Sequence, residues 1–322
     1  MKVLIATYQS AFFCPGGGEQ QLLRTYDAMK EYNVDVELFD YYNTEKISKC
    51  DIIHIFSVCY GLEALINAAK DSQKKIAVSP IHWPKNIIPD SHEYNRIRHI
   101  LLQADIIMPN SQAEANYLNR FYCLNKPQNF HVVCNGLSNF YLNHAYCHQR
   151  INKKNDETKV LFCGNIEERK NIIRLAKAVN CLGYKLTLAG RVRDKKILDE
   201  MTINNYNYTH IDGYQNESIE HLQLMNEHDI FCLPSHYETP GLAALEACVF
   251  GLKTVVSQEG CTQEYFKQQA IYCDPNSTDS IVHALRTAAD ETKNLLRPEG
   301  LENLYTWNNA ALQTIEGYRK LS

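Results

Sequence analysis

The sequence predicts an α/β protein with two doubly wound, Rossmann-like domains that face each other. Short apolar runs alternate with stretches of helical periodicity along the chain, and this alternation is typical of parallel sheets covered by helices. A polar stretch at residues 139–158 interrupts the alternation once, after which it starts again. The 322 residues are enough for two domains of about 150 residues each.

The first half begins with the apolar run VLIA at residues 3–6, which we expect to be a buried strand. A Pro-Gly-Gly-Gly turn at residues 15–18 follows, and then a helix over residues 20–32 whose apolar side chains share one face. Further strands of this half are expected at residues 36–39, 51–56, 75–80, 105–110 and 131–135.

The second half repeats the pattern after the polar stretch, which we interpret as a linker. Its strands are expected at residues 159–164, 185–190, 208–213, 229–235, 252–257 and 270–275. We therefore assign residues 1–145 to an N-terminal domain, 146–300 to a C-terminal domain and 301–322 to a C-terminal helix. Ligands of such sheets bind beyond the carboxyl ends of the strands, so two facing sheets would form a cleft.

Composition and charge exclude several classes of protein. The chain has 33 Lys and Arg against 37 Asp and Glu, a net charge of −4, and no basic stripe, so nucleic acid is not an expected partner. No apolar run approaches the ~18 residues of a membrane span, and the first apolar run is too short for a signal peptide. The 12 cysteines show no C-x2-C or C-x4-C spacing, which indicates reduced thiols rather than a zinc site. We expect a cytoplasmic protein.

One short segment has the composition of a membrane-surface contact. Lys85, Arg96 and Arg98 lie close in sequence to Trp83 and to the pair Ile87-Ile88. Because no span or lipidation signal accompanies them, we expect any membrane contact to be peripheral and weak, on the inner face of the membrane.

The strongest motif is Glu-Thr-Pro-Gly-Leu-Ala-Ala-Leu-Glu at residues 238–246, after the strand at 229–235. Pro240 suits a first helical turn, and the free amides of Gly241 and Leu242 would face an anion at the helix start. Eight residues make slightly more than two turns and return nearly to the starting angle, so Glu238 and Glu246 are expected on the same side of this helix. The alternative is that Glu238 is a helix-start carboxylate and Glu246 a solvated charge.

A second motif, Cys-Gly-Asn-Ile-Glu-Glu-Arg-Lys-Asn at residues 163–171, also joins a strand to a helix. Gly164 permits close approach of a ligand to the backbone, and Arg169 and Lys170 place two positive charges at a helix start, where they oppose the helix dipole. An Arg-Lys pair suits a diphosphate. The alternative is an ordinary exposed basic pair.

Two weaker features lie in the first half. The turn with Gly17 and Gly18 enters a helix, as phosphate-cradling or sugar-cradling turns do, but no GxGxxG or Walker A motif is present. His82 follows the strand at 75–80 and could hydrogen-bond a sugar hydroxyl, although a lone histidine is more often structural. The chain has no Asp-x-Asp, so no bound metal is expected.

Together these motifs resemble those of the family-4 retaining glycosyltransferases, which have the GT-B fold, and the resemblance covers nearly the whole chain. The motifs that carry it are Gly16-Gly17-Gly18-Glu19, Asn135-Gly136, Lys170-Asn171, Pro234-Ser235, Glu238…Glu246, Gly251, Gly260…Glu264 and Asp274-Pro275. In this fold the final helix, here Trp307 to Tyr318, crosses back onto the first domain, which binds the acceptor.

The resemblance implies a nucleotide sugar, with UDP or GDP as the expected nucleotide, and no separate cofactor. Glu246 would hold the ribose hydroxyls. Arg191 and Gly213, at the ends of the second and third strands of the second domain, are the expected base contacts. Gly17 and Gly18 would approach the donor from the first domain.

At the reacting end, the resemblance implies that the segment from Glu238 through Pro240 binds the transferred sugar and the diphosphate. The amides of Gly241 and Leu242 would take part in this binding. Arg169 and Lys170 would neutralise the departing diphosphate.

His82 would touch the sugar from the first domain. Many relatives carry Arg at the position of Asn165, and Arg169 is the expected substitute. The expected reaction is transfer, with retention, to a glycan or lipid-linked glycan. Two alternatives remain: a nucleotide-sugar epimerase or phosphorylase-like enzyme on the same scaffold, and a non-catalytic module that binds nucleotide sugars or glycans.

Overall fold

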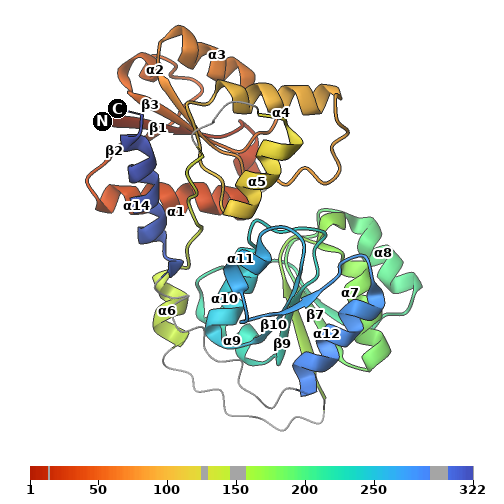
Figure 1. The fold of residues 1–322 in the computed structure, drawn as a ribbon. Helices are drawn as coiled ribbons and strands as arrows, with labels where there is room; N and C mark the ends of the chain where they lie inside the picture. Colours follow the sequence, from red (N-terminus) through yellow and green to blue (C-terminus); the bar gives the residue numbers. More distant parts are fainter. Residues whose placement is uncertain (14, 125–129, 146–156, 291–303, 322) are drawn as a thin grey trace. The chain divides into compact units, whose positions relative to one another are not determined.

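The computed structural model describes residues 1–13, 15–124, 130–145, 157–290 and 304–321. The chain divides into two compact units (Figure 1). Unit 1 contains Met1–Gly136 and Tyr305–Ser322, and unit 2 contains Leu137–Leu304. None of the helices in the described ranges is both long and apolar enough to cross a membrane.

Unit 1 is a parallel sheet with helices on both faces. Its strands are β1 (Lys2–Ala6), β2 (Asp35–Leu38), β3 (Ile52–Phe56), β4 (Lys75–Ser79) and β5 (Ile106–Ile107), in the order β2-β1-β3-β4-β5. Its helices are α1 (Gly17–Glu31), α2 (Lys46–Lys49), α3 (Glu63–Asp71), α4 (His92–Gln103), α5 (Gln112–Phe121) and α14 (Trp307–Arg319). This strand order is doubly wound, with its switch point between β1 and β3.

Alternation along the strands produces two cores in unit 1, one on each face of the sheet. Leu4, Ile53 and Ile55 pack with α3 and α4 on one face. Val3 and Ile5 pack with α1 and α14 on the other face. The side chains on both faces are almost fully buried, as expected for a parallel sheet between two helical layers.

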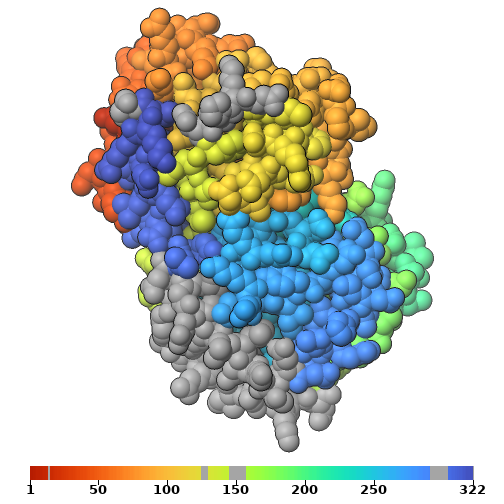
Figure 2. All heavy atoms as spheres, in the orientation of Figure 1, coloured from red at the N-terminus to blue at the C-terminus, as the bar shows by residue number. Residues whose placement is uncertain are grey.

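Helix α14 returns to unit 1 and lies against α1, as the dark blue and red segments show (Figures 1 and 2). Gly317 permits close packing of α14 on the segment that follows β5, because a Cβ there would lie 2.4 Å from Met108 Cε. The Tyr318 hydroxyl lies 2.7 Å from Nδ1 of the buried His54. A Cβ on Gly136 would lie 2.2 Å from the Thr306 carbonyl carbon, so the chain leaves and re-enters unit 1 at adjacent points.

Unit 2 is a second parallel sheet covered by helices. Its strands are β6 (Lys159–Cys163), β7 (Lys185–Ala189), β8 (Tyr208–Ile211), β9 (Ile230–Leu233), β10 (Lys253–Ser257) and β11 (Ile271–Cys273), in the order β11-β10-β9-β6-β7-β8. Its helices are α6 (Asn139–Ala145), α7 (Ile172–Leu182), α8 (Lys195–Ile203), α9 (Ile219–Asn226), α10 (Leu242–Phe250), α11 (Thr262–Phe266) and α12 (Thr278–Asp290). Numbered within the unit, the order is 3-2-1-4-5-6, that of the Rossmann fold, with its switch point between β6 and β9.

The predicted fold class is confirmed: two doubly wound α/β units, with a C-terminal helix that returns to the first. One predicted strand was wrong. Residues 131–135 run beside β5 through two backbone hydrogen bonds, from His131 N to Ile107 O and from Val133 N to Pro109 O, without forming a regular strand.

The predicted linker is also partly different. Residues 139–145 form α6, and residues 146–156 lie outside the described ranges. The compact units divide between Gly136 and Leu137 rather than at residue 145, because α6 packs against α10 of unit 2. The Tyr141 hydroxyl also ties α6 to the start of α9, since it bonds His221 Nδ1 at 2.9 Å and accepts from the Glu217 amide.

Candidate functional site

Most of the predicted site residues in unit 2 lie in loops at the carboxyl edge of its sheet. Arg169 and Lys170 follow β6, Arg191 follows β7, Gly213 follows β8 and Glu238 follows β9. Strands β6 and β9 are neighbours although about 70 residues separate them, so their loops meet at the switch point of the sheet. Doubly wound sheets bind their ligands at this position.

The loop after β6 is held close to its neighbours by glycines and by one buried asparagine. A Cβ on Gly190 would lie 1.9 Å from the Gly164 carbonyl oxygen, so the loops after β6 and β7 approach each other closely. Asn171, in the left-handed conformation before α7, donates from Nδ2 to the carbonyls of Pro234 and Pro275. These bonds fix the loop that carries Arg169 and Lys170 against the loop after β9.

Backbone contacts also fix Glu238 in place. Its carbonyl oxygen accepts from the Cys261 amide at 3.0 Å, and its backbone bridges to Gly260. A Cβ on Gly260 would lie 2.2 Å from this oxygen, so only glycine fits there. Gly241 has a φ of +90°, which favours glycine, and it directly precedes α10.

The expected geometry of the 238–246 motif was wrong in one respect. Helix α10 begins at Leu242, so Pro240 is not in its first turn, and the Thr239–Pro240 bond is cis. Glu238 therefore precedes the helix in an irregular segment, and helical periodicity does not relate its direction to that of Glu246. The first amides of α10, that of Leu242 included, still lack acceptors within the helix, as at every helix start.

Glu238 is ion-paired with both predicted cations. Lys170 Nζ lies 2.6 Å and Arg169 Nη1 3.6 Å from Glu238 Oε1, and the Glu238 side chain is only 6% exposed. Burial alone would raise the pKa of Glu238, but Lys170 and Arg169 outweigh it and hold the pKa below its usual range. Burial lowers the pKa of Lys170, against the attraction of Glu238. The carboxylate at this site is therefore ionised and paired.

Arg169 has further contacts that fix its guanidinium. Its Nη1 donates to the Tyr237 carbonyl at 3.2 Å, and its Nη2 donates to Glu167 Oε1 at 3.0 Å. The guanidinium also lies over the Tyr237 ring, 5.3 Å from its centroid. Arg169 is thus a rigid cation that remains one-third exposed.

Glu246 lies among uncharged polar side chains. Burial raises the pKa values of the Tyr141, Cys163 and Tyr214 side chains, and the nearby charge of Glu246 raises them further. Glu246 is half-buried on α10. Its neighbours place it at the carboxyl end of β6, beside the loop after β8.

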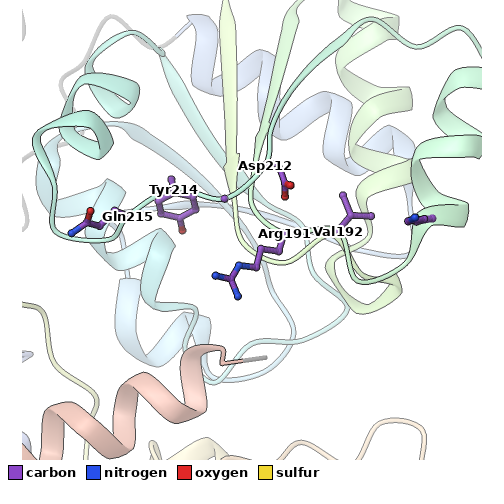
Figure 3. Close-up of a pocket in the computed structure, with 7 residues that line it drawn as sticks. Arg191, Val192, Asp212, Tyr214 and Gln215 are labelled. Atoms are coloured by element: carbon purple, nitrogen blue, oxygen red, sulfur yellow. The ribbon is translucent and has the colours of Figure 1, made fainter. Parts of the chain in front are cut away.

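An open pocket of about 830 Å³ lies between the loops after β7 and β8 (Figure 3). Both predicted base contacts, Arg191 and Gly213, line it. Asp212 and Tyr214 also line it, and their side chains come from the loop adjacent to the one that carries Arg191 (Figure 3). The predicted contacts therefore share one pocket, next to the loop with Lys170.

The remaining predicted residues, Gly17, Gly18 and His82, lie in unit 1. Gly17 and Gly18 form the first turn of α1, where Glu19 Oε2 accepts from the Gly16 amide at 2.7 Å. A Cβ on Gly17 would meet no atom within 4 Å, so packing within the structure does not require glycine there.

His82 is tied into unit 1 by two contacts. Its Nε2 lies 2.8 Å from the Tyr122 hydroxyl, and its amide donates to Oε1 of the buried Glu114 at 2.8 Å. Burial, and next the charge of Arg96, lower the pKa of His82 to about 4. The imidazole is therefore neutral near pH 7 and can donate or accept a hydrogen bond.

Two of the three cations expected at a membrane surface are engaged in the fold. Arg96 is 9% exposed and donates to the Cys59 carbonyl. Arg98 donates from Nε to the Tyr122 carbonyl at 2.8 Å. Neither guanidinium is fully available to a lipid headgroup.

Sequence reasoning missed several residues of the unit 2 site. Glu167 and Arg193 join the charged network, and Asp212 and Tyr214 line the pocket. All four directly flank predicted residues or follow the ends of predicted strands. The topology of a doubly wound sheet, which brings these loops together, was the signal that could have found them. Across the described ranges, no group of three or more His, Cys, Asp or Glu side chains is arranged to hold a metal ion.

Comparisons with known proteins agree with this architecture. Residues 147–298 match the family model "Glycosyl transferases group 1". The O-antigen chain mannosyltransferase B of Escherichia coli is 28% identical over 181 residues, which are 50% of this chain and 45% of that protein. A glycogen synthase of Mycobacterium tuberculosis is 27% identical over 174 residues, 50% of this chain and 42% of that protein. The chain thus spans about half the length of these curated relatives.

Two solved structures are similar over their whole length. The sucrose-phosphate synthase of Thermosynechococcus elongatus has a TM-score of 0.78 at 18% identity, with 100% of this chain and 99% of that chain covered. HepE of Anabaena, in complex with UDP and glucose, has a TM-score of 0.77 at 15% identity, with 99% and 100% covered. At these identities the likeness establishes the fold, which is GT-B. Residues 147–298 are thus similar to a glycosyltransferase family, within a chain that has the GT-B fold.

Proposed function

We propose that the chain is a retaining, metal-independent glycosyltransferase of family 4, which transfers a hexosyl group from a nucleotide-diphosphate sugar to a hydroxyl of a glycan or lipid-linked glycan. The observation that carries the proposal is the paired set of Arg169, Lys170 and Glu238 at the switch point of unit 2. This set lies beside the start of α10 and the loop that lines the pocket of about 830 Å³.

The charges of this set suit the departure of a diphosphate. Glycosyl transfer passes through an oxocarbenium-like state while negative charge builds on the leaving group. Fixed cations and helix-start amides stabilise that charge without reorganisation, which lowers the barrier by several kcal/mol in comparable oxyanion sites. Arg169 and Lys170 are held in place by Glu238 and the Tyr237 carbonyl, so they are already oriented before the donor binds.

Glu238 is assigned to positioning of the sugar and of the two cations, and not to nucleophilic attack. Its Oε1 is engaged by Lys170 at 2.6 Å, so the carboxylate is committed to an ion pair. Glu246, with Tyr214 nearby, is assigned to the ribose, and Arg191 and Gly213 to the base. His82, Gly17 and Gly18 are assigned to contacts made by unit 1.

The names of similar proteins support both expected nucleotides. One matched relative of Mycobacterium tuberculosis is called a GDP-mannose-dependent mannosyltransferase, whereas HepE was solved with UDP and glucose. The name of the O-antigen mannosyltransferase supports a role in the synthesis of a surface polysaccharide or lipopolysaccharide.

The experiment that tests the proposal combines donor binding with product analysis. Purified protein is incubated with UDP-glucose, UDP-galactose or GDP-mannose labelled in the sugar, with and without glycan acceptors. We expect release of the nucleoside diphosphate and an α-linked product from an α-linked donor. An epimerised nucleotide sugar would favour the epimerase alternative. Tight donor binding with neither transfer nor slow hydrolysis would favour a non-catalytic module.

A further inference from the structure

The ion pair at the switch point is part of a larger network of charged side chains that includes Arg193. Arg193 Nη1 lies 3.2 Å from Glu167 Oε2, and Arg169 Nη2 lies 3.0 Å from the other oxygen of the same carboxylate. Arg169 and Lys170 in turn pair with Glu238. Five charged side chains are therefore linked at the carboxyl edge of β6, β7 and β9.

In the ion pairs that link this network, three cations contact two carboxylates. The side chains of Arg169 and Arg193 are both 34% exposed, whereas those of Glu167 and Glu238 are 21% and 6% exposed. The accessible part of this network is therefore cationic, which favours an anionic ligand.

The position of Arg193 is set by the backbone. Its amide donates to the Ile166 carbonyl at 3.0 Å, and the Ile166 amide donates to the Arg191 carbonyl at 2.9 Å. These bonds join the loops after β6 and β7. With the Asn165 amide oriented so that its oxygen faces Arg193, this oxygen accepts from Nη2 and Nε, both at 3.1 Å. An uncharged side chain at position 165 thus helps to hold the guanidinium, which shares the Glu167 carboxylate with Arg169.

We propose that Arg193 is a third phosphate-binding cation of the donor site, placed by Asn165 and Glu167 next to Arg169. The inference rests on the proposed function and refines it. Arg191, two residues earlier in the same loop, lines the pocket assigned to the base, and Arg169, which shares the Glu167 carboxylate with Arg193, is assigned to the departing diphosphate. A nucleoside diphosphate carries its charge between the base and the sugar, and a guanidinium binds phosphate oxygens in a planar, two-point geometry. Many relatives carry an arginine at position 165, and here Arg169 is expected to take its role. Arg193 would share that role with Arg169.

The test compares nucleotide binding by Arg193→Ala and Lys196→Ala, measured by isothermal titration with UDP and GDP. Lys196 is an exposed lysine on α8, three residues away, whose removal changes the net charge equally. We expect about tenfold weaker binding of the preferred nucleotide for Arg193→Ala, as for loss of a partly exposed charged hydrogen bond, and less than about twofold for Lys196→Ala. Arg193→Lys should be intermediate, because the charge remains and the fork is lost.

A second variant restores the charge from the neighbouring position. Asn165→Arg in the Arg193→Ala background places a guanidinium at the same spot, and affinity should return to within about threefold of the original. The parent nucleoside should bind equally to all variants, because it has no phosphate. Matched melting temperatures establish that each variant is folded.

The outcomes separate the two proposals. If the unmodified chain binds neither UDP nor GDP, the proposed donor function is wrong, and the role of Arg193 with it. If it binds one of them and Arg193→Ala binds as tightly, only the assignment of Arg193 is overturned. The same holds if Lys196→Ala weakens binding equally, since the effect is then one of general charge.

Discussion

Replacement of Lys170 by methionine tests the buried ion pair on which the site is built. The two side chains are 13% and 6% exposed, and Lys170 Nζ lies 2.6 Å from Glu238 Oε1. Removal of one partner of a buried pair costs about 3–5 kcal/mol, because the other charge stays desolvated and unpaired. Arg169, 3.6 Å from the same oxygen, offsets part of this cost. We therefore expect Lys170→Met to lower the free energy of unfolding of unit 2 by about 2–3 kcal/mol at pH 7.

The loss should depend on pH with a defined sign. The pKa of Glu238 is lowered in the folded chain, so its ionisation contributes stability above the unfolded pKa of about 4.3, and this contribution is lost as pH falls through the folded pKa. Without Lys170, burial acts against a single remaining cation and the pKa of Glu238 rises. The difference in stability between the two proteins should therefore be largest near neutral pH and shrink on acidification.

The assay must report on unit 2 alone. Both tryptophans, Trp83 and Trp307, belong to unit 1, so tryptophan fluorescence is unsuitable. Amide hydrogen exchange in peptides that cover β6 and β9, read by mass spectrometry across a urea series, measures opening of unit 2 directly. Lys196→Met is the matched control, because it removes an exposed lysine from the same unit.

A double variant decides whether the pair itself is responsible. Lys170→Met combined with Glu238→Gln removes both charges, and its stability should lie within about 1 kcal/mol of the original protein. If Lys170→Met is as stable as the original at pH 7, or if Glu238→Gln does not restore stability, the account of a buried pair at this site is refuted.

Three further predictions follow from the site and the loops around it. Glu246→Ala should mainly raise the donor KM, by a factor that corresponds to about 2–4 kcal/mol, whereas Glu238→Gln should mainly lower kcat. Steady-state kinetics with folded variants distinguishes the two effects, and the reverse pattern would exchange the roles of the two residues. Activity should survive excess EDTA, because Arg169 and Lys170 are the cations assigned to the diphosphate. Complete loss of activity that Mn²⁺ or Mg²⁺ restores would contradict this. Gly190→Ala should destabilise unit 2 by more than about 2 kcal/mol in urea denaturation, because its Cβ would lie 1.9 Å from the Gly164 carbonyl oxygen at a φ of +151°; an unchanged midpoint would show that the two loops can separate.

Periodicity was sufficient to predict most of the strands and the doubly wound fold class. Apolar runs such as KVLFC and IFCL are buried on both faces, and their polar neighbours therefore mark the carboxyl edge of the sheet. The expectation that Arg169, Lys170 and Glu238 act together came from the resemblance to a known family and not from periodicity. Residues 131–135 resemble a strand in composition but lie alongside β5 with only scattered hydrogen bonds, which composition does not reveal.

Pairing of side chains was beyond the reach of the sequence. Glu238 and Lys170 are 68 residues apart, and their contact depends on the irregular backbone between Glu238 and Leu242, which helical periodicity did not anticipate. Likewise Arg193 has no motif of its own, and its contact with Glu167 exists because two loops are joined through Ile166. The local sequence pattern determines the helices and strands, whereas these side-chain contacts form only when the helices and strands pack together.

The return of α14 to unit 1 imposes an order on folding during synthesis. His54 of β3 is made 264 residues before Tyr318, with which its ring nitrogen shares a buried hydrogen bond. At about 5–20 residues per second, the ribosome needs roughly 10–50 s to cover that interval. For that time the face of the first sheet that α14 covers has no cover from this helix, whereas all the strands of unit 2 have been made before α14 emerges. The half of the chain that is made first is therefore the last to be completed, and part of the apolar face of its nascent sheet stays uncovered until α14 is made.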